Sequence, residues 1–220
     1  MATIFNRRSA LAGAAALGAG SIAAMAAAQE TETETAEGEA VAADSNLLTQ
    51  PMVIGEEDAP VTIIEYASLT CPHCARFHAV VYPQIKENYI ETGKVRFELR
   101  EVYFDRPGLW GGMLARCGDG ARYFGLVDLL YARQADWSRA GTAQEVVAQL
   151  GRIGAQAGLT EDQIGECLGN GALAEGLVAQ YQTHMEEHSI SGTPSFVVNG
   201  TMHSNMSYDD FAAVIEDELG

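Results

Sequence analysis

Basic residues are scarce in this chain, with 13 Lys and Arg against 30 Asp and Glu, a formal net charge of −17. So acidic a protein is repelled by nucleic-acid phosphates, which argues against nucleic-acid binding. Beyond the N-terminal region, no stretch approaches the roughly 18 apolar residues of a membrane-spanning helix. Cysteine is also sparse, and the spacing of the four cysteines therefore carries most of the chemical information.

The first 28 residues have the layout of an export signal. Arg7 and Arg8 precede a run of Ala, Gly and Leu that ends in small residues at 26–28. We expect cleavage after Ala28, through the general secretory route or, given the arginine pair, the twin-arginine route. A retained membrane anchor is the alternative. Export predicts a periplasmic protein, in a compartment where disulfides persist.

An acidic tail follows the predicted signal. Residues 29–58 contain nine acidic and no basic side chains, and the segment 29–50 is poor in aromatic and branched apolar residues. Such a segment cannot bury a core and is predicted to be disordered. Folded structure is expected from about Pro51.

The sequence after Pro51 predicts a strand, a helix and a second strand. Residues 61–67 are rich in β-branched side chains and read as a buried strand, and residues 95–102 alternate as another. Between them, residues 75–91 carry apolar side chains at helical spacing, and Gly93 ends that helix. This order predicts a βαβ unit.

Residues 105–189 show no strand pattern and predict helices only. The predicted helices are 109–117, 121–136, 142–157, 160–168 and 171–188. Strand character returns at 195–198, followed by an Asn199-Gly200 hairpin turn, a short return strand and a helix at 208–219. We expect an α/β domain built from 51–104 and 190–220, interrupted by a helical insertion domain at 105–189.

Cys71-Pro-His-Cys74 lies at the predicted junction of strand and helix. The thiolate is the reactive form of cysteine, and a helix N-terminus stabilises it through free N–H groups and the helix dipole. Pro72 suits an early helical position, and a protonated His73 adds positive charge beside the sulfurs. These effects lower the pKa of Cys71, which makes its disulfide oxidising.

The cysteine pair has two alternative uses, as a structural disulfide or as part of a metal site. A purely structural disulfide over so short a loop recovers only about 2–3 kcal/mol of chain entropy. A zinc site needs further ligands, and only His73 and His78 are nearby. His184 and His188 fit the string of an inverted zinc peptidase, but a third ligand is not evident and a solvated helix face is favoured. We therefore expect redox exchange and no cofactor.

A Thr193-Pro194 dipeptide precedes the strand at 195–198. Together with C-P-H-C and the order of elements, it makes residues 52–220 resemble the DsbA-like thiol:disulfide oxidoreductases, which have a thioredoxin fold with a helical insertion. The resemblance implies that Pro194 is cis and packs against the active-site disulfide, and that the backbone at Thr193 pairs with a substrate strand. It also implies exported proteins with cysteine pairs as substrates and a DsbB-type membrane reoxidase.

Glu65 lies six residues before Cys71. This position resembles that of a buried acidic residue in DsbA-like enzymes, where it is thought to tune the cysteines and relay protons. A carboxyl among Val, Ile and Ala side chains suits a proton acceptor. The alternative is a solvent-facing Glu on an edge strand.

Cys117 and Cys167 both fall in the predicted insertion. In an oxidising compartment two remaining cysteines are expected to pair, and closing a loop of about 51 residues stabilises by at most about 4 kcal/mol. Some DsbA-like proteins have such a second, non-catalytic disulfide. Two buried free thiols, or an electron relay, are the alternatives.

The direction of electron flow depends on Thr193. The Pro72-His73 pair resembles that of oxidases, whereas Thr before the cis proline is also found in disulfide isomerases. Isomerases of this kind have an N-terminal dimerisation domain, and the acidic tail is too short for one. The sequence thus favours a monomeric oxidase, with an isomerase or reductase, or a non-catalytic peptide-binding chaperone module, as alternatives.

Overall fold

The computed structural model describes residues 49–118 and 120–220. The predicted signal at 1–28 and most of the predicted tail at 29–50 lie outside these residues. Within the described ranges, no helix combines the length and apolarity that crossing a membrane requires.

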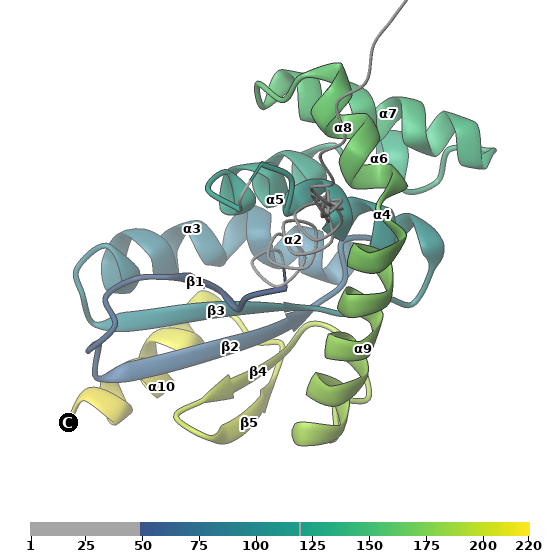
Figure 1. Ribbon diagram of the computed structural model, residues 1–220. Helices are drawn as coiled ribbons and strands as arrows, with labels where there is room; N and C mark the ends of the chain where they lie inside the picture. Colours follow the sequence, from purple (N-terminus) through teal and green to yellow (C-terminus); the bar gives the residue numbers. More distant parts are fainter. Residues whose placement is uncertain (1–48, 119) are drawn as a thin grey trace, which may run out of the picture. The chain divides into compact units, whose positions relative to one another are not determined.

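A five-stranded sheet has the strand order β1-β3-β2-β4-β5. Its strands are β1 (Met52–Ile54), β2 (Val61–Ala67), β3 (Val95–Glu101), β4 (Ser195–Val198) and β5 (Thr201–Ser204). Strands β2 and β3 run parallel and the other neighbours are antiparallel (Figure 1). The central position of β2 explains its nearly continuous apolar run, because both of its faces are covered.

The helices follow the predicted order. They are α2 (Pro72–Val80), α3 (Tyr82–Ile85), the π-helix η1 (Lys86–Ile90), α4 (Arg106–Ala115), α5 (Tyr123–Ala132), α6 (Gln134–Trp137), α7 (Ala143–Gln156), α8 (Glu161–Gly169), α9 (Gly171–Glu187) and α10 (Tyr208–Leu219). Helices α4 to α9 fall between β3 and β4, which confirms a thioredoxin-like α/β fold with a helical insertion. Thr142 and Thr160 begin α7 and α8 with capping boxes, so local sequence fixes both starts.

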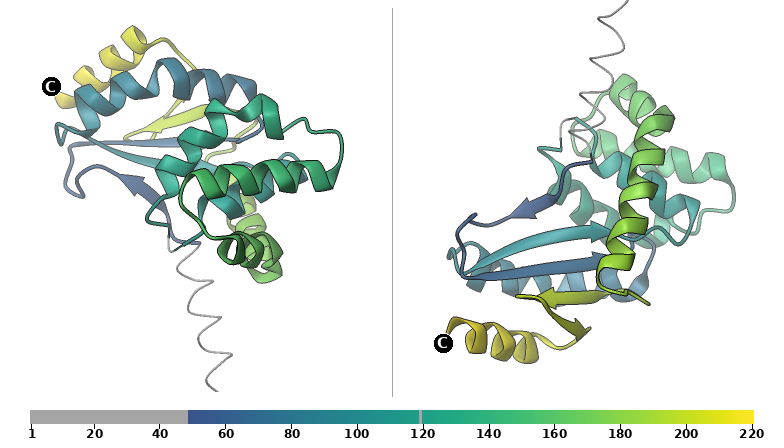
Figure 2. Two further views of the ribbon diagram at one scale, coloured as in Figure 1. Left: turned by 90° about the horizontal axis from the view of Figure 1, so that it is seen from above. Right: turned by 60° about the horizontal axis from the view of Figure 1, so that its bottom comes forward.

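The two faces of the sheet carry different helices. Helices α2, α3 and α10 cover one face, and α9 lies against the other (Figure 2). Side chains alternate along a strand, so Ile63 and Glu65 of β2 point toward α2, and Tyr66 points toward α9. The position of Glu65 in the sequence thus directs its carboxyl into the same layer as the cysteines.

Three local expectations were wrong. Strand β1 was not predicted, because three residues are too few to show alternation. The helix expected at 75–91 is divided at Val81, since Pro83 lacks an N–H and its ring clashes with the carbonyl four residues earlier. The helix expected at 121–136 ends at Ala132, and α6 begins at Gln134, whose side chain donates to the backbone carbonyl oxygen of Leu69 in the loop after β2.

A buried ion pair joins the insertion to the sheet. Arg116, directly after α4, donates from Nε and Nη2 to the two carboxylate oxygens of Glu101 in β3, at 2.9 and 2.6 Å. Both side chains are almost fully buried, with exposed fractions of 2% and 4%. These two parallel hydrogen bonds tie the end of α4 to β3.

Candidate active site

Cys71 is the N-cap residue of α2, in the turn that follows β2. Its backbone is extended, at φ −78° and ψ 121°, and Pro72 takes the first helical position. Gln134 of α6 donates through Nε2 to the carbonyl oxygens of Leu69 and Cys71, at 2.8 and 3.0 Å. The insertion therefore holds the loop that carries this cysteine.

The two thiols of the C-P-H-C segment have opposite environments. Both are free, but Cys71 is half-buried and Cys74 is fully buried. The pKa of Cys71 is lowered to about 5, chiefly by a hydrogen bond from the Cys74 thiol. Burial opposes this shift. Hydrogen bonds from Thr193 and from the backbone N–H groups of Cys74 and His73 add to it. Burial, its hydrogen bond to Cys71 and the Glu65 charge raise the pKa of Cys74. Cys71 is thus the thiolate at neutral pH and Cys74 the thiol.

The loop before β4 completes the surroundings of Cys71. The Thr193–Pro194 peptide bond is cis. When it is protonated, the Cys71 thiol donates to the backbone carbonyl oxygen of Thr193 at a sulfur–oxygen distance of 3.5 Å. Two segments far apart in the sequence therefore meet at the sulfur.

Glu65 lies beneath the cysteines in a wholly buried position. Its Oε2 atom is 2.8 Å from Nε2 of His78, and the exposed fractions of the Glu65 and His78 side chains are 0% and 2%. The alternative of a solvent-facing Glu on an edge strand is therefore wrong. His78 was considered from sequence only as a nearby metal ligand, although its spacing of four residues from Cys74 places both on one helix face.

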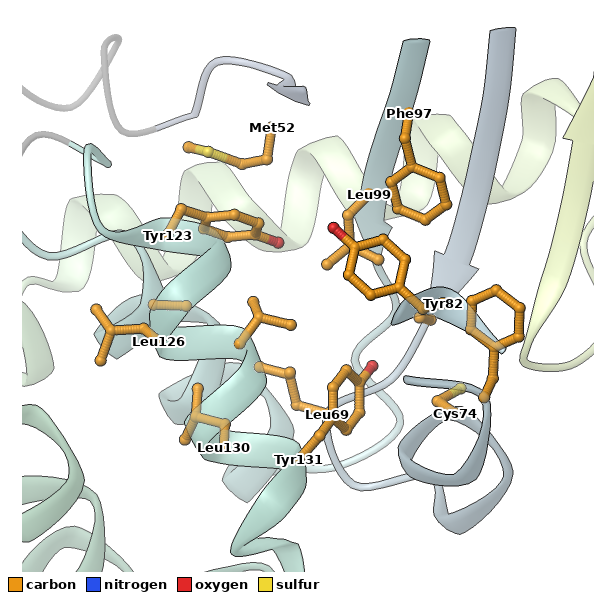
Figure 3. Close-up of a cluster of buried hydrophobic side chains, with 14 of the residues drawn as sticks. Met52, Leu69, Cys74, Tyr82, Phe97, Leu99, Tyr123, Leu126, Leu130 and Tyr131 are labelled. Atoms are coloured by element: carbon orange, nitrogen blue, oxygen red, sulfur yellow. The ribbon is translucent and has the colours of Figure 1, made fainter. Parts of the chain in front are cut away.

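Tyrosines from two helices close the space around Cys74. Figure 3 shows Tyr131 of α5 beside Cys74, with Tyr82 of α3 between them and the sheet. The Tyr131 hydroxyl donates to the backbone carbonyl of Ser68 at 3.3 Å. Burial, and then the Cys74 and Glu65 charges, raise the pKa of Tyr131 well above its ordinary value. This hydroxyl therefore remains protonated and holds the loop before Cys71.

Comparison with known proteins shows which family has this fold and this pair of cysteines. The sequence profile of the family described as Thioredoxin matches residues 48–217. The fold superposes on the crystal structure of Wolbachia pipientis alpha-DsbA1 with a TM-score of 0.72 and 28% identity, covering 80% of this chain and 96% of that one. The chain belongs to the DsbA-like group of the thioredoxin family.

Two curated relatives of this DsbA-like chain extend the likeness. A putative protein-disulfide oxidoreductase of Rickettsia bellii is 33% identical over 166 residues, which cover 75% of this chain and 63% of that protein. Disulfide bond formation protein D of Bacillus subtilis is 29% identical over 189 residues and 82% of either chain. The chain thus spans somewhat less than two thirds of the length of the Rickettsia relative.

His73 of the DsbA-like site influences Cys71 through its backbone. The His73 N–H belongs to the first turn of α2 and is among the groups that lower the pKa of Cys71, while the imidazole ring is exposed. The helix N-terminus expected from sequence is thus present. The contribution expected from a protonated His73 ring stays a prediction.

Cys117 and Cys167 form a disulfide in the insertion. Cys117 comes after Arg116 at the end of α4 and is fully buried, and Cys167 lies in α8. The bridge joins two helices of the insertion and lies in a cluster of buried side chains with Leu114 and Ile164. Because the bridge is packed among apolar side chains, its surroundings suit a disulfide that stabilises the insertion.

Within the described ranges, no three His, Cys, Asp or Glu side chains are grouped to hold a metal ion. His188 instead meets the Tyr66 hydroxyl through Nδ1, at 2.6 Å, and His184 is half-buried. The expectation of a solvated face for these two histidines was wrong, because the end of α9 packs on the sheet.

Proposed function

We propose that this chain is a thiol:disulfide oxidase that donates the Cys71–Cys74 disulfide to substrate proteins. The observation that carries the proposal is the asymmetry of the two sulfurs. Cys71 is accessible and its pKa is lowered to about 5, whereas Cys74 is buried and its pKa is raised. A sulfur that is stable as a thiolate is a good leaving group, so the reduced form is favoured and the disulfide is oxidising.

The exchange proceeds in two steps. A substrate thiolate attacks Sγ of Cys71, the Cys71–Cys74 bond breaks, and its electron pair leaves on Cys74, which takes up a proton. A second substrate thiolate then attacks the substrate sulfur of the mixed disulfide, and Cys71 leaves as a thiolate. The substrate loses two electrons and two protons in forming its disulfide, and the protein gains two electrons.

The loop at Thr193 and Pro194 is the proposed docking element. Its backbone carbonyl already lies at the Cys71 sulfur, so a substrate strand that pairs with this loop would bring its cysteine to the same place. Glu65 is proposed to tune the cysteines from beneath, and Pro72 and His73 to shape the helix start. Cys117 and Cys167 are proposed to stabilise the insertion without taking part in exchange.

The proposed compartment, substrates and reoxidising partner follow from the predicted export signal at 1–28. We place the chain in the periplasm, acting as a monomer on exported proteins with cysteine pairs, and expect a DsbB-type membrane protein to reoxidise it. The acidic segment 29–50 is proposed as a solvated tail. The α/β part is proposed to comprise 51–104 and 190–220, with 105–189 inserted.

Equilibration of the purified protein with glutathione buffers tests the proposal. A reduction potential near the strongly oxidising value of about −120 mV, typical of DsbA, supports an oxidase. A value near about −270 mV, as in thioredoxin, contradicts it and favours a reductase. Cys71→Ser tests the alternative of a non-catalytic peptide-binding chaperone module. Such a module would keep its biological effect without this sulfur, whereas an oxidase would lose it.

A further inference from the structure

Cys74 must exchange a proton in each catalytic cycle. It takes one up when the Cys71–Cys74 bond breaks, and it gives one up when the disulfide forms again. Yet its side chain is wholly buried, and burial raises its pKa. Bulk water does not reach this sulfur, so the proton needs a route through the protein.

The Glu65–His78 pair lies where such a route would begin. His78 follows Cys74 by one helical turn on the same face of α2, and Glu65 is close enough for its charge to raise the pKa of Cys74. Within the described part of the chain, Oε1 of Glu65 and Nδ1 of His78 are buried and have no hydrogen-bond partner. Buried polar atoms in proteins are nearly always bonded, so these two positions suit exchangeable partners such as water or the Cys74 thiol.

A cavity leads from His78 toward the surface. It has a volume of about 260 Å³, which accommodates several water molecules. Its walls are His78, Tyr82, Lys86, Asp128 and Tyr131, with four smaller residues. His78 is buried and Asp128 is exposed to solvent. The cavity is therefore lined both by the buried imidazole of His78 and by a carboxylate at the protein surface.

The surroundings hold the His78 ring in one orientation. The Tyr131 ring stacks on it at a centroid distance of 4.4 Å, and the Tyr82 ring lies at 4.7 Å. Nε2 is thereby fixed on Glu65, while Nδ1, on another edge of the ring, is buried and has no hydrogen-bond partner among the described residues. An imidazole that binds through both nitrogens can accept a proton at one and release it at the other.

The charged and titratable groups that face His78 come from four elements. They are Glu65 of β2, Tyr82 of α3, Lys86 of η1, and Asp128 and Tyr131 of α5, in addition to Cys74 on its own helix. Although Asp128 is exposed, the protein atoms around its carboxyl remove part of its solvation and raise its pKa, and the charges of His78 and Lys86 oppose that rise. Asp128 therefore interacts with His78 at the outer end of the cavity.

We propose that His78 is a positioning residue that passes the Cys74 proton between the Glu65 carboxyl and water in this cavity. When the active-site disulfide forms, the Cys74 proton moves to Oε1 of Glu65, directly or through one water. The proton shared between Oε2 of Glu65 and Nε2 of His78 shifts onto Nε2, and Nδ1 releases its own proton to the cavity water. The steps run in reverse when the disulfide is reduced. No electrons move along this path, and the inference rests on the proposed exchange at Cys71 and Cys74.

The experiment follows the reaction of the reduced protein with oxidised glutathione, by acid quenching and mass spectrometry. In the first step the Cys71 thiolate forms a mixed disulfide with glutathione. In the second step Cys74 loses its proton, attacks, and releases glutathione. His78→Gln, which keeps an N–H for Glu65 but cannot carry a proton, should slow the second step about 100-fold and leave the first within about threefold.

Chemical rescue separates proton transfer from a structural role. His78→Ala joins the space of the lost ring to the existing cavity, so dissolved imidazole should enter and restore the second step in proportion to its concentration. His188→Gln is the control, because it removes an imidazole on the other face of the sheet. This variant should keep the wild-type second step and show no response to imidazole.

An unchanged second step in both His78 variants overturns the inference, as does a slowed step that imidazole leaves unaffected. If His78→Ala does not fold, the second step of His78→Gln decides alone, through its rate and its dependence on pH. Failure of the proposed oxidase function is a separate result, because it is determined from the reduction potential of the wild-type protein in glutathione buffers and not from the rates of the His78 variants.

Discussion

The Sγ atom of Cys71 lies 3.5 Å from the backbone carbonyl oxygen of Thr193, across a separation of 122 residues. The helix N-terminus at Cys71 and the loop before β4 are adjacent only in the folded chain. The groups that lower the pKa of Cys71, above all the Cys74 thiol and the backbone N–H groups of Cys74 and His73, also surround its sulfur only in the folded chain, so their effect is lost on unfolding. A group of this kind couples the stability of the reduced protein to pH.

The reduced protein is expected to become more stable as pH rises from about 5 toward 9. The pKa of Cys71 is about 5 when folded and returns to its ordinary value of 9.0 when unfolded. Between these values the unfolded chain binds one more proton, so alkaline pH favours the folded state, and the gain disappears as pH falls through the folded pKa. Urea unfolding of the reduced protein at pH 5, 7 and 8.5 measures the trend.

Cys71→Ser provides the reference for that measurement, because it keeps every other titrating group. The difference in unfolding free energy between the reduced wild type and this variant should grow with pH. A difference that stays constant from pH 5 to pH 8.5 would contradict a lowered pKa at Cys71.

Cys74→Ala should raise the pKa of Cys71. The hydrogen bond from the Cys74 thiol is the largest of the causes that lower it, and alanine has no donor. Cys74→Ser retains a hydroxyl donor and should leave the pKa closer to about 5. Ultraviolet absorption of the thiolate as a function of pH measures both variants, and equal values for Ala and Ser would rule out this origin of the shift.

Much of the site could be predicted from the sequence because it depends on local order. Cys71 follows a β-branched strand and precedes Pro72, and that order is enough to predict a cysteine at a helix N-terminus. The hairpin at Asn199 and Gly200 was equally local, since both residues have positive φ, at 43° and 88°. Pattern and turn chemistry determine such features before any packing is known.

The remaining features depend on packing between distant segments. Gln134 binds the active-site loop only because α6 lies beside it, and that contact also divides the helix expected at 121–136. The pairing of Glu65 with His78 required the sheet order, which makes β2 central and buries both side chains. Neither relationship leaves a periodic signal in the sequence.

Replacing both Cys117 and Cys167 by Ala should lower stability without changing exchange at Cys71. Their disulfide closes a loop with a sequence separation of 50, which corresponds to at most about 4 kcal/mol on the chain-entropy model. Both cysteines lie in the insertion, so the pKa of Cys71 and the mixed-disulfide reaction should stay at wild-type values. Urea unfolding measures the loss.

Alkylation without reductant is the check on that bridge. Mass spectrometry should find no label on Cys117 or Cys167 in the untreated wild type. Two labelled thiols there would show that the bridge is not formed, and a double variant with altered exchange kinetics would point instead to a role in electron transfer.

Glu101→Gln should destabilise the protein far more than a matched change at the surface. Its carboxylate accepts two hydrogen bonds from Arg116, and both side chains are almost fully buried. Removing the negative charge breaks the buried ion pair between Glu101 and Arg116, which costs about 3–5 kcal/mol. Thermal and urea unfolding of the oxidised protein measure the effect.

Asp136→Asn is the matched control, because Asp136 pairs with Arg133 at 3.5 Å with both side chains largely exposed. Surface pairs of this kind contribute about 0–1 kcal/mol, and added salt should remove even that. Equal losses in the two variants would mean that burial does not set the strength of the Glu101–Arg116 pair. A large loss for Glu101→Gln alone, insensitive to salt, indicates that this pair anchors the insertion to β3, because its charges are shielded from solvent ions.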